Sequence, residues 1–193
     1  MSRNLAIKVR ELHAPNDDDL RTIQNLIVSF SCGLKDHLRE EASLRDLPGF
    51  EAEKATPGHV PSYIVRKKYS VFYRWTQDGR LSDQQLWVLD TEARCLLDVC
   101  GACERIKTTP TSISWRVFTR QCIFVYLLVF PWGLVDDFGA WTIPITVLVA
   151  YFVIAGESIA HFVEMPFGPH EDHLDLDAIC LAIDRSVSEV LTA

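Results

Sequence analysis

The sequence predicts an all-α membrane protein, with a two-helix transmembrane hairpin joined to a helical cytosolic part. Residues 121–156, 36 in all, contain no Lys or Arg, and their only charges are the adjacent Asp136 and Asp137. Elsewhere apolar residues recur at helical spacing, and no segment shows convincing strand alternation. The hydrophobic content of 48% and the mean hydropathy of +0.08 fit such a mixed architecture.

The two arms of the hairpin are predicted at Val117–Val135 and Phe138–Gly156. Each has about 19 residues, close to the roughly 20 that cross a hydrocarbon core. Backbone groups in lipid must bond internally, so both arms should be helical, with Pro131 and Pro144 kinking them rather than ending them. The alternative is a buried core hairpin of a soluble protein, because Arg120 and Pro131 interrupt the first arm.

Three features favour the membrane over a soluble core. The second arm is uninterrupted, carboxylates occupy the turn, and tryptophans lie near the arm ends, where an aromatic belt is found. These tryptophans are Trp115, Trp132 and Trp141. Basic residues precede the first arm and are absent from the turn, which predicts an outward-facing turn and cytoplasmic termini in a multi-pass protein of the cell membrane. The basic residues are Arg105, Lys107, Arg116 and Arg120.

The chain divides into three predicted parts. They are a helical cytosolic region at 1–115, the hairpin at 116–163, and a Pro-Phe-Gly segment with a C-terminal cytosolic helix at 164–193. Residues 1–120 hold 18 basic and 16 acidic side chains, and residues 121–193 hold 1 and 10. No basic stripe follows from this distribution, so nucleic acid is not an expected partner.

Helical spacing marks the cytosolic helices. A helix ends near His13, a second carries a stripe from Leu20 to Leu34, and a third spans Ser62–Trp75. The stripe consists of Leu20, Ile23, Ile27, Phe30 and Leu34. Residues 40–61 lose this periodicity and gain Gly and Pro, which predicts a surface connection.

A longer helix is expected to begin at a capping box formed by Ser82 and Gln85. Its seam consists of Leu86, Leu89, Ala93, Leu96, Cys100 and Cys103. Small residues, Gly101 among them, should let another backbone approach closely. The last helix, Leu176–Leu191, carries a stripe of Leu176, Cys180, Ile183, Val187 and Val190.

Two clusters could carry chemistry. The Cys-x-x-Cys pair of Cys100 and Cys103 lies on a helix seam without a second pair, so it is interpreted as structural thiols in a reducing compartment. Glu157, His161 and Glu164 share a helical face and could bind a metal, or could be the solvated end of the second arm. No nucleophile elbow or phosphate loop occurs, so an enzyme is not expected.

Three segments resemble the bacterial bestrophin-like proteins. They are Ala102–Pro110 directly before the hairpin, the stretch Glu164–Gly168 with Leu174–Asp177 after it, and Ser2–Ala6. The residues of the family motifs are Cys103, Glu104, Arg105, Pro166, Phe167 and Gly168. The resemblance covers nearly the whole chain.

The resemblance implies an ion channel, mostly anion-conducting and typified by chloride, built as a homo-pentamer in the lipid membrane. Family members have four membrane helices, and this chain begins just after the expected end of the second, which supplies the neck of the pore. We therefore expect a wrong start site, a fragment, or a relative that does not conduct alone. The family's cytosolic constriction is expected on or near the helix from Ser82 to Ile106.

Calcium activates animal members through an acidic run after Pro-Phe-Gly. The matching stretch here offers only Glu171 and Asp172 as adjacent carboxylates, whereas a hard cation needs several oxygens. No cofactor is therefore expected, and these two residues are the candidates for a cation clasp. Two other functions are kept as hypotheses: a non-conducting membrane-anchored adaptor, and a metal-dependent membrane enzyme that uses the Glu157 cluster.

Overall fold

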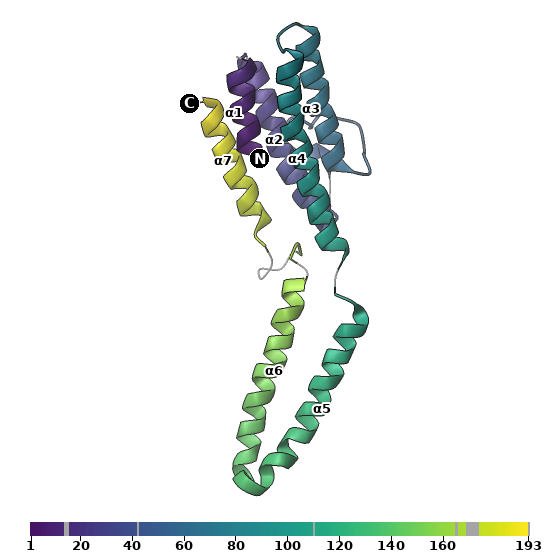
Figure 1. The fold of residues 1–193 in the computed structure, drawn as a ribbon, viewed down its shortest axis with the longest axis vertical. Coiled ribbons are helices and arrows are strands. Elements are labelled where there is room, and N and C mark those ends of the chain that lie inside the picture. Colours follow the sequence, from purple (N-terminus) through teal and green to yellow (C-terminus); the bar gives the residue numbers. More distant parts are fainter. Residues whose placement is uncertain (14–15, 42, 110, 165, 169–173, 193) are drawn as a thin grey trace. The chain divides into compact units, whose positions relative to one another are not determined.

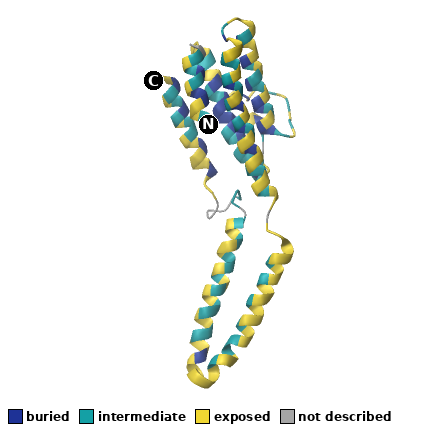
Figure 2. Ribbon diagram, viewed as in Figure 1, coloured by how far each residue is buried: buried dark blue, intermediate teal, exposed yellow. Residues whose placement is uncertain are grey.

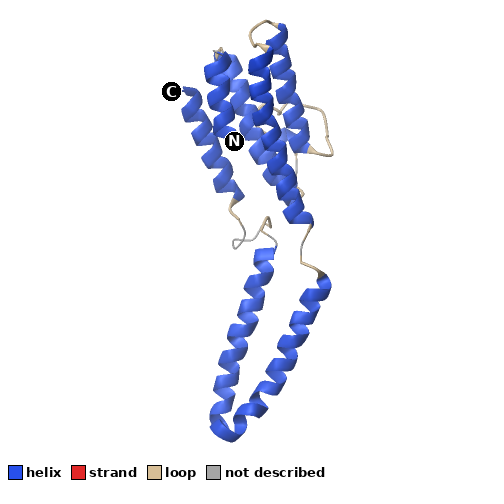
Figure 3. Ribbon diagram, viewed as in Figure 1, coloured by secondary structure: helices blue, strands red, loops and turns tan. Residues whose placement is uncertain are grey.

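The computed structural model describes residues 1–13, 16–41, 43–109, 111–164, 166–168 and 174–192. The described residues form helices and connecting loops without a strand (Figure 3), which confirms the predicted all-α class. Two compact units are present: Met1–Lys107 with Leu174–Ala193, and Thr108–His173.

The first unit is a helical bundle (Figure 1). Its helices are α1 (Ser2–His13), α2 (Asp17–Arg39), α3 (Val60–Gln77), α4 (Asp83–Thr108) and α7 (Leu176–Thr192), with a 3-10 turn η1 (Leu44–Asp46). Helix α2 packs against α1, α3 and α7, and α1 also packs against α7. Helices before and after the second unit therefore share one core.

The predicted stripes form this core. Ile23, Ile27 and Phe30 of α2 are buried, and so are Leu89 and the next seam residues of α4. Val187 of α7 is buried with them, while Leu20 and Leu34 pack against the rim. A helix that repeats apolar residues at three and four positions must cover them with neighbours, and the bundle does this.

The segment between α2 and α3 differs from the prediction. It was expected to be a surface connection, yet Leu44, Leu47 and Phe50 are buried in the core. Helix α3 also begins at Val60, two residues early, because His59 caps it and Pro61 suits a first turn. Isolated apolar residues in a loop carry no period, so periodicity misses them.

The beginning of α4 confirms the capping box. The Gln85 Oε1 accepts from the Ser82 backbone N–H at 2.9 Å, and the Ser82 hydroxyl accepts from the Gln85 N–H at 3.3 Å. The close approach predicted at Gly101 is wrong within the chain, since no atom lies within 4 Å of the position of an added Cβ. The close approach occurs instead at Gly33 of α2, where Ile64, Leu47 and Val60 surround that position.

The second unit is a helical hairpin. Helix α5 (Ile113–Phe138) and helix α6 (Thr142–Glu164) pack against each other and are joined by the short turn η2 (Gly139–Trp141). The 26 residues of α5 extend about 39 Å, enough for a hydrocarbon core of about 30 Å. Helix α5 continues through Pro131, as predicted. Pro144 lies in the first turn of α6, where a missing N–H costs nothing, so the predicted kink is wrong there.

Candidate functional site

The hairpin turns at Gly139–Trp141, just after Asp136 and Asp137, where the sequence had predicted the turn. Asp136 and Asp137 are exposed in the last turn of α5. Gly139 follows with φ of 51°, and its N–H bonds the carbonyl of Val135. This left-handed backbone favours glycine, because a side chain would crowd the chain there. The carboxylates therefore lie at the tip of the hairpin.

The apolar surface of the hairpin faces outward. The stretch Ile113–Glu164 has 52 residues, its most apolar window has a mean hydropathy of 2.0, and 6% of that window is buried. Figure 2 shows the same contrast, with exposed residues along α5 and α6 and buried ones inside the bundle. A core hairpin of a soluble protein would be buried, so the exposure favours lipid contact over the soluble alternative.

Two arginines of α5 are paired with two glutamates of α6. The Arg120 Nε lies 2.6 Å from the Glu157 Oε1, and the Arg116 Nη2 lies 3.1 Å from the Glu164 Oε2. Arg120 was one of the two residues that interrupted the first predicted arm, with Pro131. Its charge is balanced by the other arm, which removes much of the cost of placing it in an apolar segment.

The predicted metal cluster on α6 is not assembled. Glu157 faces Arg120 and Glu164 faces Arg116, and the nearest approach to His161 is 3.9 Å from its Nδ1 to the Glu164 Oε2. The arginines supply the positive charge that a metal would supply. This part of the hairpin is therefore a set of interarm ion pairs.

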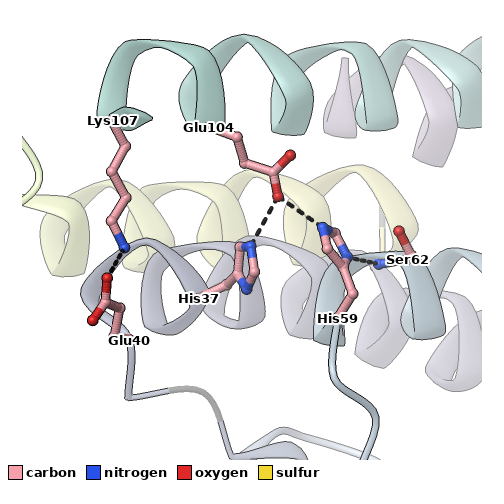
Figure 4. A network of polar contacts seen from close by, with 6 residues as sticks. All are labelled: His37, Glu40, His59, Ser62, Glu104 and Lys107. Atoms are coloured by element: carbon pink, nitrogen blue, oxygen red, sulfur yellow. Dashed lines mark hydrogen bonds and ion pairs between the residues drawn. The ribbon is translucent and has the colours of Figure 1, made fainter. Parts of the chain in front are cut away.

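The motif residues of α4 occupy the end of that helix. The Glu104 Oε1 lies 2.7 Å from the His59 Nε2 and 2.8 Å from the His37 Nε2 (Figure 4). Lys107, one turn further, donates to Glu40 at 2.8 Å. Burial raises the pKa of Cys103, which keeps its thiol protonated. Arg105 lies in the same last turn.

These contacts hold three helix ends together. His37 is in the last turn of α2, and His59 is the N-cap of α3, where its Nδ1 accepts from the Ser62 N–H at 3.1 Å. His59 and then His37 hold the pKa of Glu104 below its usual range, so the carboxylate is charged at neutral pH. Glu104, a residue of the family motif, thus links the ends of α2, α3 and α4.

The segment after α6 is described only in part. Pro166, Phe167 and Gly168 form a partly buried turn. Glu171 and Asp172, the candidates for a cation clasp, lie outside the described residues. The Asp177 carboxylate, at the beginning of α7, accepts from Lys35 at 2.8 Å and from Arg39 at 2.9 Å.

The cysteines carry free thiols. Cys100 is buried on the seam of α4, as a structural thiol would be. Cys32 of α2 and Cys180 of α7 are neighbours whose interaction lowers the pKa of Cys32 and raises that of Cys180, a pairing that was not predicted. Their separation of 148 positions leaves no local signal.

Sequence reasoning also missed His37 and His59. They are 67 and 45 positions from Glu104, and neither lies in a recognisable motif. The arginine pairs had a signal that went unused. Arg116 and Arg120 share one face of α5, and Glu157 with Glu164 share one face of α6.

A helical bundle joined to an apolar hairpin with internally paired charges defines a helical membrane protein. The family model described as "Bacterial/Fungal Bestrophin protein" matches residues 1–189, and the chain belongs to the bestrophin family.

The relatives and solved structures agree with this assignment. The chain is 26% identical to a voltage-dependent anion channel-forming protein of Nostoc over 98% of its length, and 26% identical to the voltage-dependent anion channel-forming protein YneE of Escherichia coli K12 over 95%. It spans 64% and 62% of those two proteins. A bacterial bestrophin homologue from Klebsiella pneumoniae matches 98% of the chain and 72% of its own, with a TM-score of 0.90 and 26% identity.

Proposed function

We propose that this chain forms part of the subunit of an anion channel, with chloride as the typical permeant ion. The family match and the relatives' names as anion channel-forming proteins support this function. Family membership also favours a channel over the metal-dependent enzyme considered from the sequence.

The observation that carries the proposal is the hairpin with its exposed apolar surface and paired internal charges. One face of α5 forms an open apolar groove of about 900 Å³. Its lining includes Phe118, Tyr126 and Phe130. Such a face is suited to contact with lipid or with further transmembrane helices, because its lining is almost entirely apolar.

The channel is proposed to be a homo-oligomer, a pentamer by resemblance to the family. Aromatic side chains left exposed on the bundle support contacts between subunits. Trp87 of α4 is 72% exposed and Tyr73 of α3 is 63% exposed, and large aromatic residues are enriched at protein interfaces. The hairpin is proposed to cross the cell membrane twice, with its acidic corner outside and both termini in the cytoplasm.

Anion flux from liposomes tests the function. The chain would be reconstituted as it stands, and also together with any in-frame sequence upstream of Met1, and chloride release would be compared with sodium release. We expect chloride to leave faster than sodium from vesicles holding the conducting form. Equal release of both ions would contradict anion selectivity.

The mass of the detergent-solubilised complex tests the assembly. We expect five copies by native mass spectrometry, without other proteins. Dimers or mixed complexes, with no flux from either form, would favour the membrane-anchored adaptor instead.

A further inference from the structure

Glu104 receives two imidazoles on one oxygen. One possible ligand atom from each of His37, His59 and Glu104 lies within 4.8 Å of the other two. The two rings are 4.5 Å apart between centroids and are tilted by 49°. Figure 4 shows all three side chains converging from α2, α4 and the beginning of α3.

The cluster is accessible without being fully exposed. The side chains of His37, Glu104 and His59 are 24%, 34% and 39% exposed. A metal ion could therefore enter from water and still be held by three helix ends. Among the residues that the structure describes, this is the group whose donor atoms converge in this way.

We propose that His37, His59 and Glu104 form a binding site for a divalent transition metal, with zinc as the preferred ion. Two imidazole nitrogens and one carboxylate oxygen are the donor set of zinc sites that keep a fourth position open for water. Calcium and magnesium are not expected to bind here, because those ions prefer sites made of oxygen ligands. The proposal does not depend on ion conduction.

The geometry needs only small changes to accept the ion. Zinc lies about 2.0–2.1 Å from each donor, so tetrahedral donors are about 3.3 Å apart. The carboxylate oxygen is now 2.7–2.8 Å from each nitrogen and must move outward by about 0.5 Å. The metal replaces the two N–H to carboxylate hydrogen bonds that now hold the cluster, and the proton on the Nε2 of each ring must move to the Nδ1 of that ring.

Binding at His59 also moves a proton. Its Nδ1 accepts from the Ser62 N–H, so in the metal-free form the neutral ring carries its proton on Nε2. Zinc needs the lone pair of Nε2, and the proton therefore transfers to Nδ1 through water, while the Ser62 N–H turns to solvent. The overall charge of the ring does not change. Metal binding therefore breaks the hydrogen bond by which His59 caps α3.

The lysine one turn after Glu104 has its own carboxylate partner. Lys107 donates a hydrogen bond to Glu40, so its positive charge is directed away from the His37, His59 and Glu104 cluster.

Equilibrium dialysis of the purified protein against zinc tests the site. Bound zinc would be measured by mass spectrometry of the metal, with magnesium and calcium as separate arms. A His170→Gln/His173→Gln background removes the histidines that follow Pro-Phe-Gly in the sequence. We expect about one zinc ion per chain from micromolar free metal, and no retained magnesium or calcium.

Substitutions separate ligation from structure. His59→Asn keeps an N-cap for α3, because Asn is a favoured capping residue, but removes the ring nitrogen. His37→Ala removes the second ring. We expect each to lower zinc affinity by at least about tenfold, while His161→Gln, which removes an imidazole of the hairpin, leaves the affinity unchanged.

Cobalt gives a readout on the unmodified protein, in case a variant does not fold. Tetrahedral Co²⁺ with nitrogen and oxygen donors gives intense visible absorption bands, and zinc should displace them. The proposal is overturned if the unmodified protein retains no zinc at micromolar concentrations. It is equally overturned if the His59→Asn protein binds zinc and develops the cobalt bands as the unmodified protein does.

Discussion

Arg120 Nε lies 2.6 Å from Glu157 Oε1 and joins α5 to α6 within the hairpin. The residues are 37 positions apart, and each is the charge that would otherwise stand alone in an apolar helix. This pair explains how an arginine is accommodated in the first arm.

Glu157→Leu should destabilise the hairpin by about 1–3 kcal/mol, because it leaves the Arg120 guanidinium without its partner in an apolar segment. The double substitution Arg120→Leu/Glu157→Leu should be close to neutral, since it removes both charges. Unfolding in detergent by titration with a denaturing surfactant measures both. As a control, Lys107→Ala at the exposed Glu40 pair should change nothing measurable.

Asp137→Cys, in a background without native cysteines, should react with a membrane-impermeant maleimide added outside intact cells. The reason is that the acidic corner is proposed to face outward. Tyr73→Cys, at an exposed position of α3, should react only after permeabilisation. Labelling of both positions from the same side of the membrane would refute the proposed topology.

Gly33→Ala should destabilise the bundle by about 1–3 kcal/mol. The new methyl would meet the Ile64 Cδ1 at 2.9 Å and two further side chains at 3.1 Å, so these side chains must be displaced from their present packing. Gly101→Ala is the matched control. Nothing lies within 4 Å of its Cβ, and an alanine in the middle of α4 should stabilise by about 0.5–1 kcal/mol. Equal effects in thermal unfolding would contradict the packing described at Gly33.

Lys68 is a buried amine whose Nζ has no hydrogen-bond partner among the described residues and lies 5.6 Å from the centre of the Phe30 ring. Burial lowers its pKa to about 7. The unfolded chain, with an ordinary lysine pKa near 10.4, then binds more protons than the folded chain between about pH 7 and pH 10. The free energy of unfolding should therefore rise with pH across this window, by at most about 1.4 kcal/mol per unit.

Lys68→Met should remove this pH dependence and raise the stability at about pH 7, because it keeps the apolar stem and removes the charge that burial disfavours. Unfolding free energies of the two proteins across the window give the measurement. Parallel profiles for the two proteins would show that Lys68 is hydrated or paired.

Cys32 should be the most reactive of the thiols on the bundle. The hydrogen bond from Cys180, and then the charge of Lys35, lower the pKa of Cys32 to about 7, although burial opposes them. Cys180→Ala should shift the alkylation profile of Cys32 toward higher pH. Mass spectrometry after iodoacetamide treatment measures this. Cys103, whose pKa is raised by burial, serves as the slow internal reference.

The sequence predicts the helices of this protein well because their signals are local. The stripe from Leu20 to Leu34 and the seam of α4 are periodic, and Ser82 with Gln85 is a short-range cap. The hairpin can likewise be predicted from its apolar composition. The family motifs also indicated Glu104 before its surroundings were known.

The residues that surround Glu104 cannot be predicted from local sequence signals. His37 and His59 reach it from a helix end and a loop, and only the packing of α2, α3 and α4 brings them together. The misassigned cluster on α6 shows the converse error. Glu157, His161 and Glu164 share a face, but the opposing helix supplies arginines, which spacing along one helix does not reveal.

The bundle is made from helices that precede the hairpin and one helix that follows it, and this fixes an order of assembly. Helix α7 packs against α1 and α2, yet the ribosome makes it after α5 and α6. The core positions that Val187 and Leu191 fill stay open to water until the hairpin has been synthesised. Completion of the bundle is therefore necessarily a late, post-hairpin event during biogenesis.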